Sequence, residues 1–383
     1  MKIADLAAPI FVTAQSELDT LLQTLRVQSS IAVDTESNSL FAYEERVCLI
    51  QFSTDAHDYI VDPLVLQDIS PLGAIFADAR IEKIFHAAEY DLIGLRRDFN
   101  WDVENVFDTM IAARTLGWPR VGLASILENE YGVKLNKRFQ RADWGKRPLS
   151  KQQLAYARMD THFLLPMRER LGNDLRANDQ SEEAREEFER IRRSSLRSKP
   201  EKTDEPNPDG FWRISGARDL NGKEAAILRE LYLYRERAAR KWDRPPFKVI
   251  GNETLIAIAR KKPRVPQELE SIKGMTPRQL RRHGEHLIEA VQIARELPKP
   301  KPPSFQRVAD DVLQRYEALH QWRKKRARKR GVESDIILAR EVLWDLARTN
   351  PTTLAELESI SELGAWRREN YGLDILYVLE EQS

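Results

Sequence analysis

Two hydrophobic patterns share the first 100 residues. Apolar residues recur at helical spacing in Gln15–Val27, which predicts an amphipathic helix. Short apolar runs rich in β-branched residues, typical of buried strands, follow at Ile31–Val33, Val47–Phe52 and Asp58–Val61. Because only short connections separate these runs, we expect an antiparallel meander. A further short strand is expected at Lys83–His86.

Helical patterns dominate the next 100 residues, so an α/β domain with a mixed sheet flanked by helices is expected. Ser150 and Gln153 have the spacing of a capping box at the start of the last of these helices. Asp179–Arg193 alternates in charge along a further helix, and the proline pairs in Ser194–Gly210 indicate a linker. The helices of the α/β domain that follow the first strands are expected at Ala88–Phe99, Asp108–Gly117, Ala124–Tyr131 and Leu154–Arg170.

The remainder of the chain contains an internal repeat. Glu268–Ile272 recurs unchanged 88 positions later as Glu356–Ile360, and Arg235 corresponds in the same register to Arg323. Such a repeat predicts two homologous all-helical modules, joined here by the proline-rich connector Pro298–Pro303. The expected domains are residues 1–170, a charged helix and linker at 171–210, a first module at 211–297 and a second at 304–380.

Composition narrows the class of protein. The 383 residues are 32% charged and 42% hydrophobic, which is typical of a soluble chain with more than one domain. The single cysteine, Cys48, excludes an intrachain disulfide and fits a reducing compartment. No apolar run has the length of a membrane span, and Asp5 interrupts the N-terminal stretch before a signal-peptide core. We therefore expect a cytoplasmic monomer with no membrane partner.

Charge is distributed unevenly along the chain. Residues 1–200 carry 26 Lys and Arg against 31 Asp and Glu, net −5, whereas the remainder carries 35 against 29, net +6. An acidic half joined to a basic half favours a protein that uses cations in one part and holds a polyanion with the other.

Five residues in the acidic half are candidates for chemistry. Asp34 and Glu36 lie two apart in a buried strand, so both carboxylates project from one sheet face, at a cost unless a cation neutralises them. Asp91 follows a strand end in the first turn of a helix, where α/β sheets place ligands. Tyr156 and Asp160 are four apart and share a helix face. A hard ion such as Mg²⁺ favours such an oxygen cluster.

These residues, in this order, resemble the 3′-to-5′ exonucleases that use four acidic residues and a tyrosine, and most closely the ribonuclease D family. The segment Arg141–Leu149 (RADWGKRPL) has the same likeness. The resemblance implies an RNase H-like exonuclease domain followed by two HRDC domains, a helical nucleic-acid-binding type. It also implies that two divalent ions, Mg²⁺ or Mn²⁺, are held by the carboxylates and that the tyrosine orients the attacking water. The residues concerned are Asp34, which would bridge the ions, Glu36, Asp91, Asp160 and Tyr156.

The resemblance implies an exoribonuclease that releases nucleoside 5′-monophosphates from RNA 3′ ends. Its expected partners are tRNA precursors and other small structured RNAs. Two alternatives stay open, namely a single-stranded DNA exonuclease of the same family and a non-catalytic RNA-binding adaptor on an inactive nuclease fold.

Further candidates are less specific. A basic run closes the long helix of the second module, where it could contact phosphates or simply form a solvated face at a helix C-terminus. His86 could act as a base, but a histidine that ends a strand is more often a hydrogen-bonded structural residue. His283 and His286 could pair for zinc, although no further Cys or His is near them. The basic run of the second module comprises Arg323, Lys324, Lys325, Arg326, Arg328, Lys329 and Arg330. Trp212, Trp242, Trp322, Trp344 and Trp366 could stack bases, but their helical spacing favours core positions.

Overall fold

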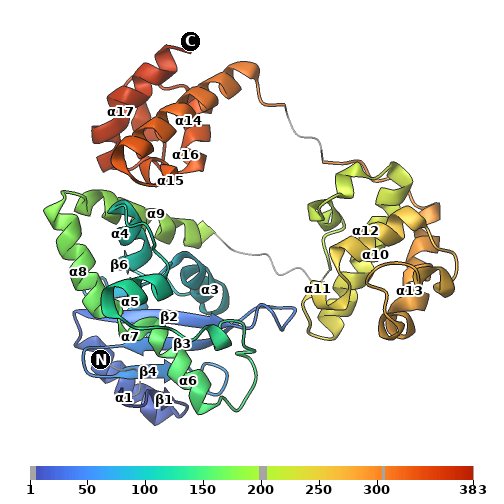
Figure 1. Cartoon of the computed structure of the whole chain (residues 1–383), viewed down its shortest axis with the longest axis horizontal. Coiled ribbons are helices and arrows are strands. Elements are labelled where there is room, and N and C mark those ends of the chain that lie inside the picture. The colour runs from blue at the N-terminus through green and yellow to red at the C-terminus, as the bar shows by residue number, and fades with distance from the viewer. Residues whose placement is uncertain (1–5, 198–204, 304–306, 383) are drawn as a thin grey trace. The chain divides into compact units, whose positions relative to one another are not determined.

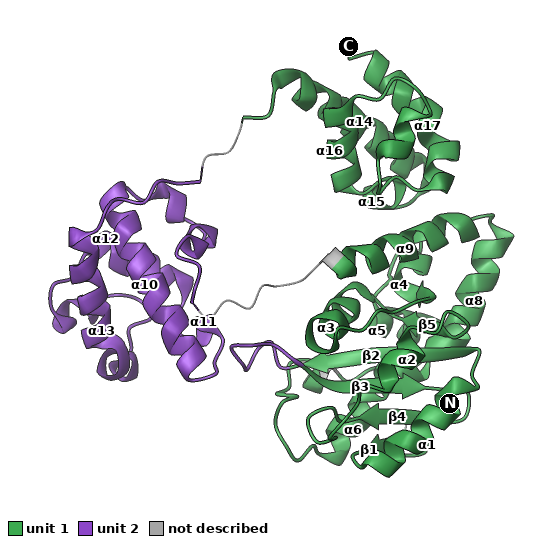
Figure 2. Ribbon diagram, turned by 180° about the vertical axis from the view of Figure 1, so that it is seen from behind, with its two compact units in different colours: residues 1–37, 47–200, 307–383 green, residues 38–46, 201–306 purple. Residues whose placement is uncertain are grey.

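The computed structural model describes residues 6–197, 205–303 and 307–382 (Figure 1). Asp5 and part of the linker predicted at Ser194–Gly210 therefore lie outside the described residues, although Ser194 itself belongs to a helix. The chain divides into two compact units, coloured in Figure 2. The first unit comprises residues 1–37, 47–200 and 307–383, and the second comprises residues 38–46 and 201–306.

A mixed sheet of six strands forms the centre of the N-terminal part of the first unit, counted over residues 6–197. Its strand order is β1-β4-β3-β2-β5-β6. The central strands β2, β3 and β4 pair antiparallel, which confirms the predicted meander, whereas β5 and β6 run parallel to β2. The strands are β1 (Ile10–Val12), β2 (Ser30–Ser37), β3 (Val47–Ser53), β4 (Asp58–Val61), β5 (Glu82–Phe85) and β6 (Val106–Asp108).

Hydrophobic burial explains the central strands. Every residue of β3 is buried, and Ile31, Ala32 and Val33 of β2 are fully buried. The strands β1 and β6 were not predicted, because each has only three residues and joins an edge of the sheet. Such a segment is too short to display a hydrophobic period of its own.

Nine α-helices and the 3-10 helix η2 (Lys137–Phe139) accompany the sheet over residues 6–197. Residues of α1, α3, α4, α8 and α9 share the main hydrophobic core with the strands. The Ser150/Gln153 capping box is confirmed, because Gln153 N donates to Ser150 Oγ and Gln153 Oε1 accepts from Ser150 N. The helices are α1 (Gln15–Arg26), α2 (Leu72–Phe76), α3 (Glu89–Phe99), α4 (Thr109–Thr115), α5 (Leu123–Tyr131), α6 (Lys151–Ala157), α7 (Met159–His162), α8 (Leu164–Ala177) and α9 (Ser181–Arg197).

The single helix predicted over Leu154–Arg170 is wrong, because α6, α7 and α8 divide this segment. Thr161 Oγ1 donates to Arg158 O, a local bond that competes with the regular helix ladder. Pro166 lacks an N–H group, so the ladder cannot run unbroken from α7 into α8. The break leaves α7 short and packed on β2 and β3.

The charged helix predicted at Asp179–Arg193 corresponds to α9, which covers the sheet domain rather than lying free. Its apolar stripe of Ala184, Phe188 and Ile191 is buried in the main core, and Phe188 lies 4.9 Å from Phe107 between ring centroids. The opposite face of α9 contacts the C-terminal module, as described below.

The second unit contains the first helical module. Its core surrounds the long helix α10. The segment Asn38–Arg46 belongs to the same unit, where Tyr43 N donates to Asp243 Oδ1 at 2.9 Å and Lys248 Nζ lies 3.8 Å from the centroid of the Phe41 ring. The elements are η3 (Gly210–Arg213), η4 (Ala217–Asp219), α10 (Gly222–Lys241), α11 (Pro246–Val249), α12 (Asn252–Lys261), η5 (Pro266–Leu269) and α13 (Pro277–Glu296).

The second helical module repeats this architecture in the first unit. In one copy Arg235 donates to Ile250 O at 3.3 Å, and 88 positions later Arg323 donates to Leu338 O at 2.8 Å. Both arginines are buried, so each ties the long helix to the turn that follows it. The elements of the second copy are α14 (Asp310–Arg330), α15 (Ser334–Ile337), α16 (Arg340–Thr349), η6 (Glu356–Ser359) and α17 (Ala365–Glu380).

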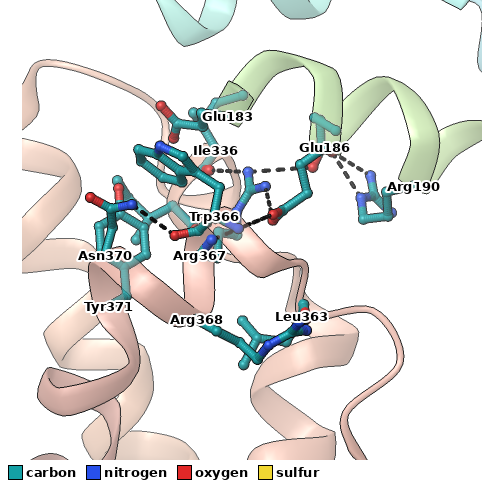
Figure 3. Close-up of polar contacts among 12 residues, drawn as sticks. Glu183, Glu186, Arg190, Ile336, Leu363, Trp366, Arg367, Arg368, Asn370 and Tyr371 are labelled. Carbon is teal, nitrogen blue, oxygen red and sulfur yellow. Dashed lines mark hydrogen bonds and ion pairs between the residues drawn. The ribbon is translucent and has the colours of Figure 1, made fainter. Parts of the chain in front are cut away.

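The second module is docked on α9 through buried ion pairs. Arg367 pairs with Glu186 at 2.7 Å, and Glu186 Oε2 also accepts from Trp366 N, so it caps α17 from the neighbouring helix (Figure 3). Gly364 makes this possible, since a Cβ there would lie 1.8 Å from Glu186 Cδ. In the first copy the equivalent residue is Thr276, whose own hydroxyl caps α13.

A search of the described residues finds no helix both long enough and apolar enough to cross a membrane.

Candidate active site

Strand β2 places two carboxylates at the centre of the sheet. Asp34 and Glu36 follow the fully buried residues of this strand and are mostly buried themselves. Asp34 lies opposite Gln51 of β3, and the register shifts between Glu36 and Ser37, where the pairing with β3 becomes irregular. The strand therefore delivers two acids side by side from a rigid element.

Asp91 is the third acid and is buried in the first turn of α3. Its Oδ1 accepts from Thr35 N at 2.9 Å and from Thr35 Oγ1 at 2.5 Å, so the residue between Asp34 and Glu36 fixes this carboxylate. The turn before α3 is held by Asp108, which accepts from Ala87 N and Ala88 N as well as capping α4.

Tyr156 and Asp160 complete the set from α6 and α7. The Tyr156 ring lies between two aromatic side chains, with centroids 6.0 Å from Trp144 and 6.0 Å from Phe139. Trp144 is buried in a small cluster with Cys48, Leu49, Ile60 and Ala157, separate from the main core. Packing therefore restricts where the phenol can point.

Arg147 fastens the segment that carries Trp144. Its guanidinium pairs with both carboxylate oxygens of the buried Asp62, at 2.5 and 2.7 Å. It also donates to Trp144 O at 2.6 Å and to Cys48 O at 2.9 Å. Bidentate arginine pairs are among the strongest charge-assisted hydrogen bonds, so this clamp ties the segment to β3 and β4.

Burial raises the pKa of all four acids, and repulsion within the cluster adds to this for Asp34, Glu36 and Asp160. Burial raises the pKa of Asp34 well above its ordinary value, and repulsion from Asp91, Asp160 and Glu36 adds to this. Burial and then repulsion from Asp160 and Asp91 raise the pKa of Glu36 in the same way. The pKa of Asp91 and that of Asp160 are each raised to about 7, in both cases chiefly by burial. The structure thus brings all four sequence-predicted carboxylates within electrostatic reach.

The charges of the acid cluster also act on Tyr156. Burial, followed by the charges of Asp160, Glu36 and Asp34, raises its pKa above the ordinary value of a phenol. The hydroxyl is therefore protonated throughout the physiological pH range and can donate a hydrogen bond.

The donor set fits a hard divalent cation, because it consists only of carboxylate oxygens that repel each other when ionised. Among residues 6–197, 205–303 and 307–382, no three His, Cys, Asp or Glu side chains form a group that could hold an ion as they stand. Asp91 is engaged by Thr35 in this arrangement.

Gln51 was missed by sequence reasoning. Its side chain is fully buried opposite Asp34, and neither amide atom has a hydrogen-bond partner among the described residues. A buried unpaired amide is costly, and this one stands opposite a carboxylate of the acid set. The available signal was one polar residue in the otherwise apolar run Val47–Phe52.

The histidine candidates have structural partners. His86 Nδ1 lies 2.9 Å from Thr109 Oγ1, which itself donates to Phe85 O, and burial lowers the pKa of His86 to about 4. This supports the structural interpretation over a general base. His283 is buried and bonds Tyr234, whereas His286 is paired with Glu289.

The basic run of the second module divides into two groups. Arg323 is buried against Leu338 O, Arg330 pairs with the buried Glu183 at 2.5 Å, and Arg326 pairs with Asp374. These three side chains have partners in the protein, so the run is only partly available to a ligand. Its exposed members are Lys324, Lys325, Arg328 and Lys329.

The tryptophans of the helical modules pack in cores. Trp212 is buried in the first module, and the other four are partly buried against the core of their own module. This supports the core interpretation given to them from helical spacing.

Comparisons with known proteins identify the domains of the chain. Residues 9–176 match the family described as 3′-5′ exonuclease, and residues 224–291 and 312–379 each match the HRDC domain. The chain is 31% identical to exosome complex exonuclease RRP6 of Saccharomyces cerevisiae over 368 residues, covering 88% of the chain and 50% of that protein. It is 29% identical to ribonuclease D of Pseudomonas paraeruginosa, covering 93% of both.

Among solved structures, Escherichia coli RNase D, described as an exoribonuclease involved in structured RNA processing, matches with a TM-score of 0.70 and 27% identity. The match covers 98% of this chain and 99% of that one. The chain spans about half the length of the yeast relative. Because the two matched domain types together span most of the sequence, the chain belongs to the 3′-5′ exonuclease family, in the ribonuclease D group that joins HRDC domains to the exonuclease domain.

Proposed function

We propose that this chain is a metal-dependent 3′-to-5′ exoribonuclease that releases nucleoside 5′-monophosphates. The observation that carries this proposal is the convergence of Asp34, Glu36, Asp91 and Asp160, whose charges repel one another unless a cation joins them. The similarity to ribonuclease D supports the choice of RNA over DNA.

The acids would hold two divalent ions, Mg²⁺ or Mn²⁺. Asp34, Glu36, Asp91 and Asp160 would supply the carboxylate ligands of the pair. Such ions supply a hydroxide at neutral pH and neutralise the charge that develops on the leaving oxygen. In the protein, Thr35 donates a hydrogen bond to Asp91, and strand β2 carries Asp34 and Glu36.

Tyr156 would orient the attacking water by a hydrogen bond from its neutral phenol. Its raised pKa keeps that hydrogen in place, and its packing between Trp144 and Phe139 limits the directions it can take. Orientation of this kind contributes to rate without a change in charge.

The proposed substrates are tRNA precursors and other small structured RNAs with short 3′ extensions. E. coli RNase D, which this chain resembles over nearly its full length, is described as acting in structured RNA processing. The exposed cations of the second module are proposed as additional phosphate contacts that give affinity without sequence choice. These are Lys324, Lys325, Arg328 and Lys329.

Incubation of end-labelled RNA and DNA of equal sequence with Mg²⁺ or Mn²⁺ tests the proposal. We expect stepwise shortening of the RNA from its 3′ end and mononucleotide products. Preferential loss of the DNA would favour the single-stranded DNA exonuclease instead. Intact RNA bound to the protein after long incubation with metal would favour the non-catalytic adaptor.

A further inference from the structure

A groove of about 740 Å³ on the first helical module is strongly basic. It lies at the start of α10, the end of α12 and the end of α13, and a single carboxylate, Glu268, stands among its lining residues. Six cations against one carboxylate give the lining a formal charge of +5. The cations are Lys223, Lys261, Lys262, Arg264, Arg295 and Lys299.

The second module provides an internal comparison, because it folds in the same way without these charges. Glu268 is retained as Glu356, and both carboxylates accept from the backbone four residues earlier, from Arg264 N at 2.8 Å and from Thr352 N at 2.7 Å. The fold therefore does not require cations around the groove. In the second copy, Lys223, Lys261, Lys262 and Arg264 are replaced by Asp311, Thr349, Asn350 and Thr352.

Backbone geometry at the groove is also shared. Lys262 ends α12 in the left-handed region with a φ of 55°, and Asn350 ends α16 there with a φ of 47°. Asparagine is among the residues that adopt this conformation most readily, so a lysine at this position is not explained by the turn. The charge is a property of the first copy alone.

Three of these cations are available to a ligand. Lys262 pairs with Glu224 at 3.0 Å, Lys261 Nζ donates to Glu268 O at 3.0 Å, and Arg295 donates to Lys262 O at 3.5 Å. No hydrogen bond or ion pair within the described residues engages the side chains of Lys223, Arg264 and Lys299. Lys223 also stands in the first turn of α10, where the helix dipole disfavours a cation. A bound anion would offset both the dipole and the mutual repulsion of the lysines.

We propose that this groove binds the phosphodiester backbone of an RNA strand. The choice of RNA rests on the exoribonuclease function proposed above, while the groove itself rests on the charge and geometry just described. The cations contact phosphates rather than base edges, so the site confers affinity that depends on salt and little on sequence.

The second module has a groove at a different place, and that groove is not basic. It measures about 1080 Å³ between α9, α14 and α17, and its four cations face four carboxylates, so its formal charge is zero. Two of those cations, Arg326 and Arg330, are already paired with Asp374 and Glu183. The two copies have thus diverged, the first toward RNA and the second toward docking on α9.

The test uses the full chain with three residues of the first copy exchanged for those of the second: Lys261→Thr, Lys262→Asn and Arg264→Thr. Each replacement already occupies the equivalent position of a folded module. The control variant removes the same charge from exposed positions of the same module outside the groove, Lys273→Gln, Arg278→Gln and Arg281→Gln. Fluorescence anisotropy with a labelled single-stranded RNA and a labelled RNA hairpin, without divalent ions, measures affinity at several salt concentrations.

We expect the groove variant to bind about 10-fold more weakly at low salt, and the slope of log K against log salt to fall by about 2. The control should change affinity less than 3-fold. Equal losses in the two variants would overturn the proposal, because they would indicate only a nonspecific charge effect. A loss found only on exchanging Lys324, Lys325 and Arg328 for glutamine would also overturn it.

The measurements distinguish failure of the groove proposal from failure of the proposed exonuclease function. Hydrolysis of the same RNA by the parent chain with Mg²⁺ or Mn²⁺ is measured separately. If the parent cleaves RNA but the groove variant binds normally, only the groove proposal fails. If the parent binds RNA through the groove without cleaving it, only the exonuclease proposal fails.

Discussion

Trp144 stacks on Tyr156 with ring centroids 6.0 Å apart and ring planes inclined by 30°. The backbone of Trp144 is held as well, because Arg147 donates to Trp144 O while pairing with the buried Asp62. A residue outside the acidic set therefore determines how the phenol is presented.

Trp144→Leu should lower kcat by about 10-fold and leave KM for RNA nearly unchanged, because the phenol loses its orientation while the RNA contacts stay. Steady-state kinetics measure both constants. Trp118→Leu, at a partly buried tryptophan of the same domain, serves as the control for a general packing loss. A rise in KM alone would contradict an orienting role.

Tyr156→Phe should slow the chemical step by about 10- to 100-fold with little change in RNA affinity, since only the orienting hydrogen bond is removed. Single-turnover rates and anisotropy separate the two effects. The variant and the parent should share the same pH profile below pH 9, because the raised pKa of Tyr156 keeps the parent phenol protonated there. If the rate of the parent alone changes with pH in this range, Tyr156 gains or loses a proton there.

Asp34→Asn should abolish turnover, because one of the carboxylates proposed to hold the ions becomes neutral. The same change should raise Tm in the absence of divalent ions, since it removes one of several mutually repelling charges. Activity assays and thermal unfolding in EDTA test both outcomes. Parental turnover in the variant would remove the metal hypothesis.

The metal-free chain should become less stable as pH rises from 5 to 8. The pKa of Asp91 and that of Asp160 are raised from 3.8 to about 7. Their protonated forms therefore favour the folded state below pH 4, and this contribution is lost as pH rises through 7. We expect the free energy of unfolding to fall by about 1 kcal/mol or more, and each kcal/mol corresponds to roughly 2–4 °C in Tm.

Thermal unfolding in EDTA across this pH range measures the effect, and saturating Mg²⁺ should reverse it, because bound cations favour the ionised carboxylates. Asp160→Asn should flatten the metal-free profile. A Tm that rises steadily with pH in EDTA would contradict the raised pKa values.

Gly364→Ala should release the second module from α9, because its Cβ would collide with Glu186 at the start of α17. Limited proteolysis should then cut the module more than 10-fold faster. Gly122→Ala is the matched control, since Gly122 also precedes a helix but has open space around it. Equal protection of both variants would show that α17 accommodates the added carbon.

The acidic set could be predicted from sequence because strand and helix periods determine which side chains share a face. Asp34 and Glu36 needed only the period of β2, and Tyr156 and Asp160 remained neighbours even though a helix break fell between them. The supports of the site could not be predicted in this way. Thr35 and Arg147 act through partners 56 and 85 positions away, which no local pattern specifies.

The same reason explains the basic run. In sequence, Arg323 and Arg330 look like their neighbours Lys324 and Lys329, yet the first pair is engaged by Leu338 O and Glu183. Only tertiary packing distinguishes an arginine that is engaged within the protein from a lysine that stays exposed.

Docking of α17 onto α9 makes the first unit discontinuous in sequence, since residues 307–383 belong with residues 1–37 and 47–200. The module in between is consequently an insert anchored at both ends. A protease that severs the chain just after α9 would yield two fragments that still migrate together under native conditions. The ion pairs of Arg367 and Arg330 would keep the C-terminal fragment bound to α9.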